Sequence, residues 1–96
     1  MAQFLARIHM EIVFHKNFKK QYQKLPKKVQ VQVQFVIRLE LFIAEPNNPI
    51  LHVHQLHGED SAYTSMNVTA DYRALFIEDR VRVTFYKIGS HSELYS

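Results

Sequence analysis

Residues 72–88 read YRALFIEDRVRVTFYKI, two apolar runs on either side of the polar turn Glu78-Asp79-Arg80. Residues 72–77 and 81–88 are rich in the β-branched and aromatic side chains that favour strands. We therefore predict an antiparallel hairpin. Such a hairpin can bring the middle of the chain close to its C-terminal end.

The residues before the hairpin predict two more strands. Residues 51–56 (LHVHQL) predict a short strand, and residues 57–60, His-Gly-Glu-Asp, indicate a turn. Residues 62–68 alternate, so that Tyr63, Ser65 and Asn67 lie on one side of a strand. Thr69-Ala70 then turns the chain into the hairpin. The second half of the chain therefore predicts one antiparallel sheet.

The first residues with a clear pattern are 10–15, which alternate and predict a first strand. Asn17 can cap a short helix that carries Phe18, Tyr22 and Leu25 on one face. Pro26 closes this helix and can serve as the first residue of the next one.

Residues 27–45 carry two conflicting patterns. Apolar residues alternate with polar ones over residues 29–35, which is typical of a strand, and the β-branched content agrees. A helical stripe runs through the same segment (Val29, Val33, Val36, Ile37, Leu41 and Ala44). The segment is too long for an ordinary strand, so its length favours a helix. The order β-α-α-β-β-β-β predicts an α+β fold, with both helices on one face of the sheet.

Composition is consistent with one small domain. The chain has 96 residues, of which 47% are hydrophobic, and it has no cysteine, which fits a reducing cytoplasm. No apolar run reaches the length of a membrane span. We expect residues 1–9 to be an N-terminal extension and residues 10–96 to form the domain. The net charge of +3 and the lysines of the first third favour anionic partners, although a solvated helix face explains the lysines equally well.

Histidines are the candidate chemical groups. His52, His54 and His57 permit a metal site, with Asp60 or Asp71 as a further ligand. No second ligand pair accompanies them, so acid–base catalysis is the better interpretation, because histidine titrates near neutrality.

RNA cleavage is a reaction that such groups can perform. It needs a base for the 2′-hydroxyl, a cation for the phosphorane and an acid for the 5′-oxygen leaving group. His54, His91 and Asp71 are candidate acids and bases, and Asp71 can alternatively orient a histidine. Arg73 can hold a phosphate or form a salt bridge. Tyr72 and Tyr95 offer aromatic faces for a base, although Tyr72 equally suits a core position.

Several motifs in order resemble the RelE/ParE toxin superfamily, and most closely its YafQ-type branch. They are residues 54–58 (HQLHG), Tyr63, residues 71–76 (DYRALF) and residues 88–95 (IGSHSELY). The earlier residues Phe14, Phe18, Lys19, Lys20, Leu25 and Pro26 also fit. The resemblance covers residue 10 to the end of the chain.

The resemblance implies a fold, an activity and partners. The fold is two N-terminal helices on a twisted antiparallel sheet, here of four to five strands. The activity is that of a cytoplasmic type II toxin: a metal-independent endoribonuclease without a cofactor, which enters the ribosomal A site and cuts mRNA. The cognate antitoxin wraps such a toxin, and operator DNA is bound only through their complex. No membrane is involved.

By position, the resemblance assigns His54, Asp71 and His91 to catalysis. We expect His91 to be the general acid and His54 or Asp71 the base, although the two roles can be exchanged. Arg73 matches an arginine that contacts the phosphate, and Tyr95 matches a C-terminal aromatic residue that stacks on a base. Asn67 departs from the pattern, because YafQ-like enzymes can carry a further catalytic histidine there. An asparagine can bind RNA by hydrogen bonds but cannot transfer a proton at neutral pH, so we expect a weakened activity or redistributed roles.

Two alternatives stay open. A ParE-like member would inhibit a protein target such as DNA gyrase without cutting RNA, and a degenerate member would only bind its antitoxin. The pair His54 and His91 argues against the first, because a pure binding protein does not need titrating groups. Asn67 keeps the second open.

Overall fold

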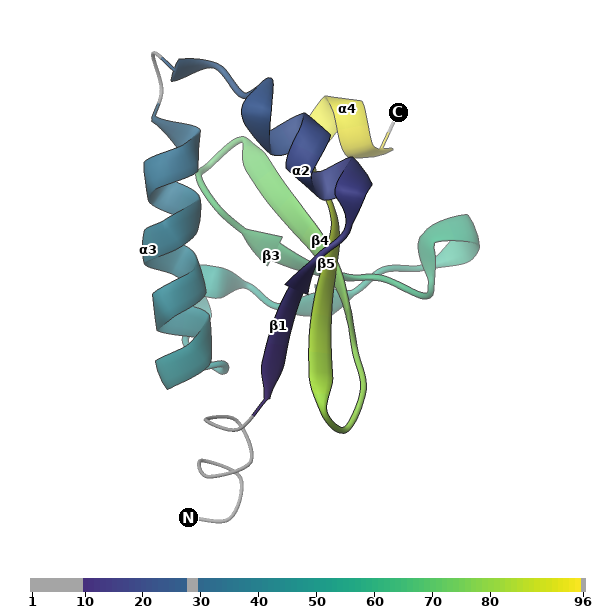
Figure 1. Cartoon of the computed structure of the whole chain (residues 1–96). Coiled ribbons are helices and arrows are strands. Elements are labelled where there is room, and N and C mark those ends of the chain that lie inside the picture. Colours follow the sequence, from purple (N-terminus) through teal and green to yellow (C-terminus); the bar gives the residue numbers. More distant parts are fainter. Residues whose placement is uncertain (1–9, 28–29, 96) are drawn as a thin grey trace.

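The computed structural model describes residues 10–27 and 30–95, and the predicted extension at residues 1–9 lies outside them (Figure 1). Within these described residues, five strands and three helices follow one another, with short 3-10 turns at Pro49–Leu51 and Gly58–Asp60. The elements are β1 (Glu11–Phe14), α2 (Lys16–Gln23), α3 (Val31–Ala44), β2 (His54–Gln55), β3 (Thr64–Asn67), β4 (Tyr72–Glu78), β5 (Arg82–Ser90) and α4 (His91–Tyr95).

The five strands form one sheet in the order β1-β5-β4-β3-β2. The four strands after residue 50 pair antiparallel, which confirms the predicted hairpin and its two neighbours. β1 pairs parallel with β5, so the prediction of a wholly antiparallel sheet was wrong for this strand. The reason is topological: the chain leaves β1 through two helices and three strands before β5 returns beside it, which is a crossover connection.

The conflict in residues 27–45 is resolved as a helix. α3 spans Val31–Ala44 and buries Val31, Phe35 and Phe42, whose spacing matches one helical face. Pro26 is not its first residue, because Gln30, in the left-handed conformation with φ 51°, directly precedes the helix. The N-cap of α2 was also predicted two residues too late. His15, not Asn17, is the N-cap, and its Nδ1 accepts a hydrogen bond of 3.1 Å from the Asn17 amide.

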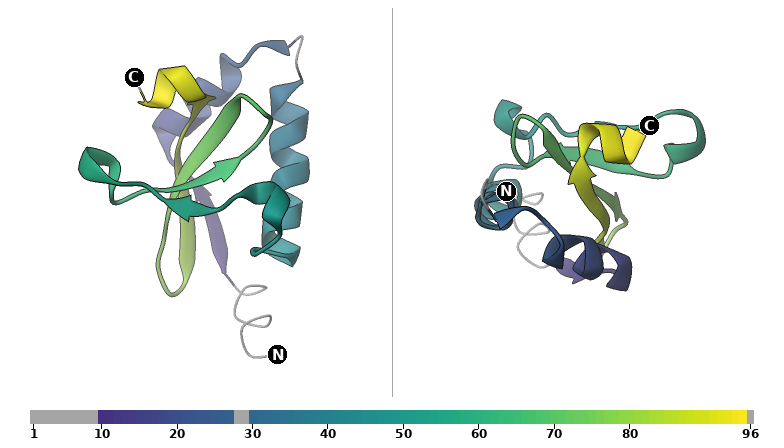
Figure 2. Two further views of the ribbon diagram at one scale, coloured as in Figure 1. Left: turned by 180° about the vertical axis from the view of Figure 1, so that it is seen from behind. Right: turned by 90° about the horizontal axis from the view of Figure 1, so that it is seen from above.

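The core fills the space between one face of the sheet and the helices α2 and α3, as predicted. Figure 2 shows both helices on the same side of the sheet. Phe85 of β5 is fully buried at the centre, and its ring centroid lies 5.3 to 6.5 Å from those of Phe14, Phe18, Phe35, Phe42 and Phe76. These residues come from β1, α2, α3 and β4, so a single aromatic cluster joins most of the fold.

Two local features differ from the predictions. The strand predicted at residues 51–56 is only His54–Gln55, because Pro49–Leu51 makes a 3-10 turn that the Asn48 side chain caps. The C-terminal residues His91–Tyr95 form the short helix α4, which we did not predict. Within the described ranges, none of the helices is both long and apolar enough to cross a bilayer.

Phe85→Ala tests the aromatic cluster. We expect it to lower the free energy of unfolding by about 3–5 kcal/mol, because it leaves a cavity among five rings. Val81→Ala is the control, since Val81 is 62% exposed, and should change stability by less than about 0.5 kcal/mol. Urea unfolding followed by circular dichroism measures both. Equal effects of the two substitutions would show that the cluster does not dominate the core.

Candidate functional site

The face of the sheet away from α2 and α3, here called the distal face, carries one row of side chains across four strands. His54 is the register partner of Ser65, Ser65 of Leu75, and Leu75 of Lys87. Register partners in neighbouring strands lie on the same face of a sheet. Leu75 is fully buried but does not belong to the core cluster under the helices, which agrees with a position on the distal face.

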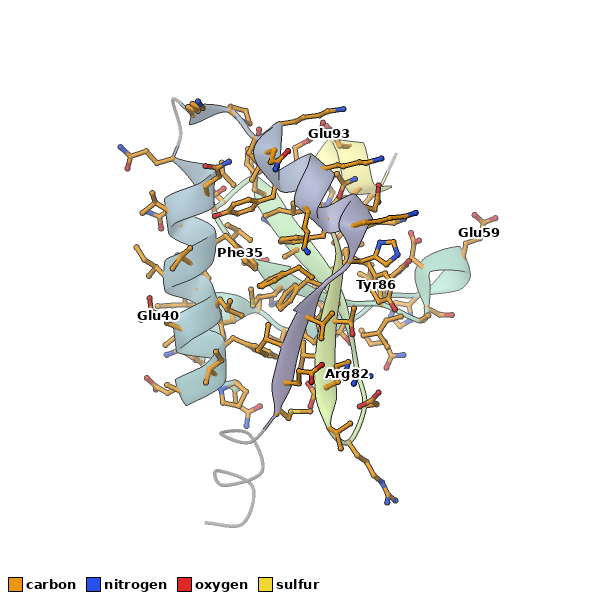
Figure 3. The ribbon with its side chains drawn as sticks, viewed as in Figure 1. Phe35, Glu40, Glu59, Arg82, Tyr86 and Glu93 are labelled. Atoms are coloured by element: carbon orange, nitrogen blue, oxygen red, sulfur yellow. The ribbon has the colours of Figure 1, made fainter. Side chains whose placement is uncertain are left out.

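A β-bulge changes the alternation of β5 on this face. Leu75 pairs with Lys87 and Phe76 pairs with Phe85, so Tyr86 is the extra residue. Phe85 and Ile88 on either side are both buried in the core. Tyr86 and Lys87 are half-buried and point away from it, which places a phenol and an ammonium group side by side on the distal face. In Figure 3, Phe35 lies between α3 and the strands, and Tyr86 lies on the other side of β5.

α4 folds back over the distal face. The hydroxyl of Tyr95 lies 2.9 Å from the buried hydroxyl of Ser65, so the two form a hydrogen bond. The His91 ring packs against Tyr95, with 4.6 Å between the ring centroids. His91 and Tyr95 therefore lie on the same side of the sheet as His54. Gly89 lies against α4, since a Cβ placed there would be 3.4 Å from both the Glu93 carboxylate and the Leu94 side chain, an ordinary van der Waals contact.

A capping box starts α4. The Ser90 amide donates to the Glu93 carboxylate at 2.8 Å, and the Glu93 amide donates to the Ser90 hydroxyl at 3.2 Å. Hydrogen bonds from the Ser90 backbone and side chain hold the pKa of the Glu93 carboxyl below its ordinary value. The box fixes the direction in which the chain leaves β5 and, with it, the position of His91.

His54 has a defined hydrogen bond. Its Nδ1 lies 2.8 Å from the backbone carbonyl of His52. A carbonyl oxygen only accepts, so Nδ1 must be the donor, and the neutral imidazole then carries its lone pair on Nε2. The His52 and His54 rings are 4.6 Å apart, but no group of three or more metal-ligating side chains occurs within residues 10–27 and 30–95.

Asp71, Arg73 and Asn67 lie around the β3–β4 turn: Asn67 is the last residue of β3, Asp71 directly precedes β4, and Arg73 is its second residue. Asp71 is exposed, and its carbonyl accepts a hydrogen bond of 2.8 Å from the His91 amide. Nη1 of Arg73 donates to the carbonyls of Thr69, Ala70 and Tyr72 at 2.9 to 3.1 Å, so this guanidinium nitrogen holds the β3–β4 turn. Asn67 is the register partner of Arg73, and its Oδ1 is buried without a hydrogen-bond partner.

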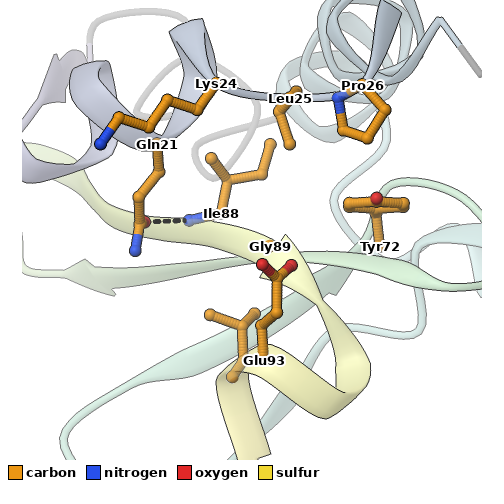
Figure 4. Close-up of a pocket in the computed structure, with 9 residues that line it drawn as sticks. Gln21, Lys24, Leu25, Pro26, Tyr72, Ile88, Gly89 and Glu93 are labelled. Atoms are coloured by element: carbon orange, nitrogen blue, oxygen red, sulfur yellow. Dashed lines mark hydrogen bonds between the residues drawn. The ribbon is translucent and has the colours of Figure 1, made fainter. Parts of the chain in front are cut away.

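Tyr72 is separated from the other candidate residues. It packs against the core cluster on the helix side of β4. There it lines a pocket of about 260 Å³ together with Lys24, Leu25, Glu93 and others (Figure 4). The structure thus brings His54, His91 and Tyr95 to the distal face, and it does not bring Tyr72 there.

The residues that we did not predict for this face are Ser65, Tyr86 and Lys87. Sequence alternation does place Ser65 beside Tyr63, but it does not show that Tyr95 returns to it. The pattern Ser-x-x-Glu at residues 90–93 is a readable capping signal for α4. Nothing in the sequence marks the bulge that turns Tyr86 and Lys87 to one side.

Comparison with known proteins finds the same fold in bacterial and archaeal toxins. YafQ from E. coli strain BL21(DE3) matches with a TM-score of 0.78 and 17% identity over 91% of this chain and 99% of YafQ. The E. coli DinJ–YafQ toxin–antitoxin complex gives 0.78 and 18% over 92% and 99%. An archaeal RelE–RelB complex from Pyrococcus horikoshii OT3 gives 0.64 and 20% over 85% and 94%. These likenesses show that the chain has the RelE-like fold. No protein-family model and no curated protein matches the sequence.

The capping box predicts a pH response in α4. The lowered pKa of Glu93 means that the carboxylate stabilises α4 above its ordinary pKa, and that this stabilisation is lost as pH falls through the lowered value. We expect the amide proton of Ser90 to titrate in NMR spectra with a midpoint below the ordinary pKa of a glutamate side chain. Glu93→Gln should remove this titration. A midpoint at or above the ordinary value would contradict the capping box.

Proposed function

We propose that this protein is the toxin of a type II toxin–antitoxin module and a ribosome-dependent mRNA endoribonuclease. The observation that carries the proposal is the return of α4 over the distal face, where Tyr95 bonds to Ser65. It brings His91 to the face on which His54 and Lys87 lie. A RelE-like fold with titrating groups and a cation on this face fits RNA cleavage better than binding alone.

The reaction would follow acid–base chemistry. Nε2 of His54 takes the proton of a 2′-hydroxyl, and the oxygen attacks the adjacent phosphorus. The ammonium of Lys87, with Arg73, stabilises the charge of the pentacoordinate phosphorane. His91 protonates the 5′-oxygen as its bond to phosphorus breaks. The hydrogen bond of His54 to the His52 carbonyl supports His54 as the base, because it leaves the lone pair on Nε2. Asp71, beside the His91 amide, is the alternative base or a positioning group.

The shape of the molecule supports a need for the ribosome. His54 and His91 are both exposed, and neither lines the two pockets found near the helices. An open face of this kind positions a flexible RNA poorly by itself, and orientation contributes a large part of a catalysed rate. An mRNA already held in the ribosomal A site would supply that orientation.

A protein partner is supported by the opposite side of the molecule. Between α2 and α3 lies an apolar groove of about 340 Å³, lined by Phe14, Phe18, Tyr22, Phe35 and Leu39 among others. On α3 beside it, Val33, Val36 and Ile37 are 46 to 53% exposed. Such a patch on a small domain favours a partner, and the lysines of α2 favour an acidic one. We propose the cognate antitoxin as this partner, in the cytoplasm, with operator DNA bound only by the complex.

The second candidate function is inhibition of a protein target such as DNA gyrase. A YoeB/ParE toxin from Agrobacterium tumefaciens shares the fold, with a TM-score of 0.67 and 16% identity over 85% of this chain and 99% of that toxin. Asn67 in place of a proton-transfer group is the observation that favours it. A protein that arrests growth and supercoiling without cutting mRNA would establish this alternative.

His91→Ala and His54→Ala test the catalytic proposal. Each should lower cleavage of ribosome-bound mRNA by about 10²–10⁴-fold, the usual contribution of a general acid or base. Both side chains are exposed, so the fold should not change. His57→Ala is the matched control, since His57 is an exposed histidine whose side chain makes no capping bond. Primer extension measures cleavage and circular dichroism measures folding. A folded double variant that cuts at the wild-type rate would contradict the mechanism.

Asn67→His tests whether the missing proton-transfer group limits the rate. We expect faster mRNA cleavage, because an imidazole beside Arg73 can exchange a proton where the amide cannot. Asn67→Gln keeps an amide and should give no gain. An equal rate in Asn67→His and the wild-type protein would show that the step does not depend on this position.

Antitoxin binding should weaken as salt rises, because Lys19 lines the apolar groove and Lys16 and Lys20 lie on the same helix, α2. Val36→Asp should reduce binding to an acidic antitoxin, since it places a negative charge in the groove. Val81→Asp, at an exposed position away from the helices, is the control. Titration calorimetry at two salt concentrations measures both effects. Co-expression with the product of a neighbouring gene that never yields a complex would count against this partner.

A further inference from the structure

Three aromatic rings lie in contact on the distal face beside the candidate catalytic row. The ring centroids of His15 and Tyr86 are 5.0 Å apart, and those of Tyr86 and Tyr63 are 5.8 Å apart. We call these three residues the aromatic ledge. All three are half-buried. The solvent-exposed face of a sheet normally carries polar side chains, so three adjoining aromatic rings on this face require an explanation.

Each ring reaches the ledge for a separate structural reason. Tyr63 continues the alternation of Ser65 and Asn67 in β3. Tyr86 is the extra residue of the β5 bulge, and without the bulge Tyr86 and Lys87 would point to opposite faces. His15 follows the parallel strand β1, whose alternate residues Ile12 and Phe14 pack against the core. Elements far apart in the sequence therefore contribute to one surface.

The ledge is held in place before any ligand binds. Nδ1 of His15 accepts the Asn17 amide at 3.1 Å, which fixes the ring and leaves the proton of the neutral imidazole on Nε2. Nζ of Lys87 lies 5.2 Å from the centroid of the Tyr63 ring. Side chains that are already ordered lose little entropy on binding, so their contacts contribute more fully to affinity.

The chemistry of the ledge matches a single-stranded nucleotide. Aromatic rings stack on any base, and a neighbouring cation binds the phosphate that follows it. Lys87 is both a neighbour of Tyr63 and the register partner of Leu75 in the row that carries His54 and Ser65. A phosphodiester bound at Lys87 would therefore have the catalytic row with His54 on one side of it and the aromatic rings of Tyr63 and Tyr86 on the other.

We propose that His15, Tyr63 and Tyr86 form a base-stacking subsite for single-stranded RNA that flanks the cleaved phosphodiester. The subsite deepens the proposed ribonuclease function and rests on it for its biological substrate. It binds the nucleotide next to the reacting one by stacking, and it does so without reading the sequence, because every base has an aromatic face.

Binding of an uncleavable RNA tests the subsite apart from catalysis. The probe is a fluorescein-labelled octamer of 2′-O-methyl adenosine, measured by anisotropy at low salt without ribosomes. Tyr86→Leu keeps a large apolar side chain but removes the aromatic face. We expect it to weaken binding by about 5- to 150-fold, as for one lost stacking partner. Tyr86→Phe keeps the ring and should bind like the wild-type protein.

His15→Asn provides a second, independent variant. Asparagine is a good N-cap, so α2 should remain capped while the ring is lost. It should also weaken octamer binding, whereas His57→Ala, outside the ledge, should not. Circular dichroism confirms that each variant is folded. Equal affinity in Tyr86→Leu, His15→Asn and the wild-type protein, or no measurable binding by the wild-type protein, would overturn the subsite.

The two proposals fail in different ways. If ribosomal cleavage is absent but Tyr86→Leu still weakens octamer binding, the subsite stands and the ribonuclease function does not. If cleavage depends on His54 and His91 but Tyr86→Leu and His15→Asn bind the octamer as tightly as the wild-type protein, the ribonuclease function stands and the subsite is wrong.

Discussion

The backbone of β5 must be hydrogen-bonded on both of its edges, and this requirement organises the molecule. β4 covers one edge over its whole length, but β1 covers the other only from Arg82 to Phe85. Beyond β1, the His15 amide donates to the Phe85 carbonyl at 2.9 Å, and the Gln21 side chain accepts from the Ile88 amide at 2.8 Å. α2 thus continues the edge that β1 leaves open, which satisfies polar groups that would be costly to bury unpaired.

The same arrangement divides the sheet into two faces with different roles. The aromatic cluster around Phe85 takes up the helix side, where burial of apolar rings supplies most of the stability. The distal face is then available for polar side chains, and α4 partly covers it. The bulge at Tyr86 serves both faces, because it keeps Phe85 and Ile88 in the core while it turns Tyr86 and Lys87 outward. A site on this face can therefore change without loss of the core.

Sequence reasoning succeeds here where a pattern is local. Alternation identifies β3, β-branched and aromatic content identifies the hairpin of β4 and β5, and length decides α3 against the competing strand pattern of residues 29–35. The parallel pairing of β1 depends on a contact with β5 far along the chain, which no local pattern records. The same limit applies to Tyr72. An aromatic side chain suits stacking on an RNA base as well as burial in the core, and it is the register of β4 that shows Tyr72 on the helix side. His54 and His91 lie on one face of the sheet, and their catalytic role stays a prediction, whereas Lys87 reaches that face only through the bulge. The Ser90–Glu93 capping box was readable and would have predicted α4.

The proposed mechanism predicts specific chemical ends on the cleaved RNA, which a protein that only binds its target would not produce. Attack by a 2′-hydroxyl, with His91 as acid on the leaving oxygen, must leave a 2′,3′-cyclic phosphate on the upstream fragment and a 5′-hydroxyl on the downstream one. Mass spectrometry of mRNA fragments from ribosomes incubated with the purified protein identifies the 3′ end of the upstream fragment and the 5′ end of the downstream fragment. Cyclic phosphate with 5′-hydroxyl ends is the predicted result. Fragments with 5′-phosphate ends, or intact mRNA under conditions in which the protein arrests growth, would contradict the account.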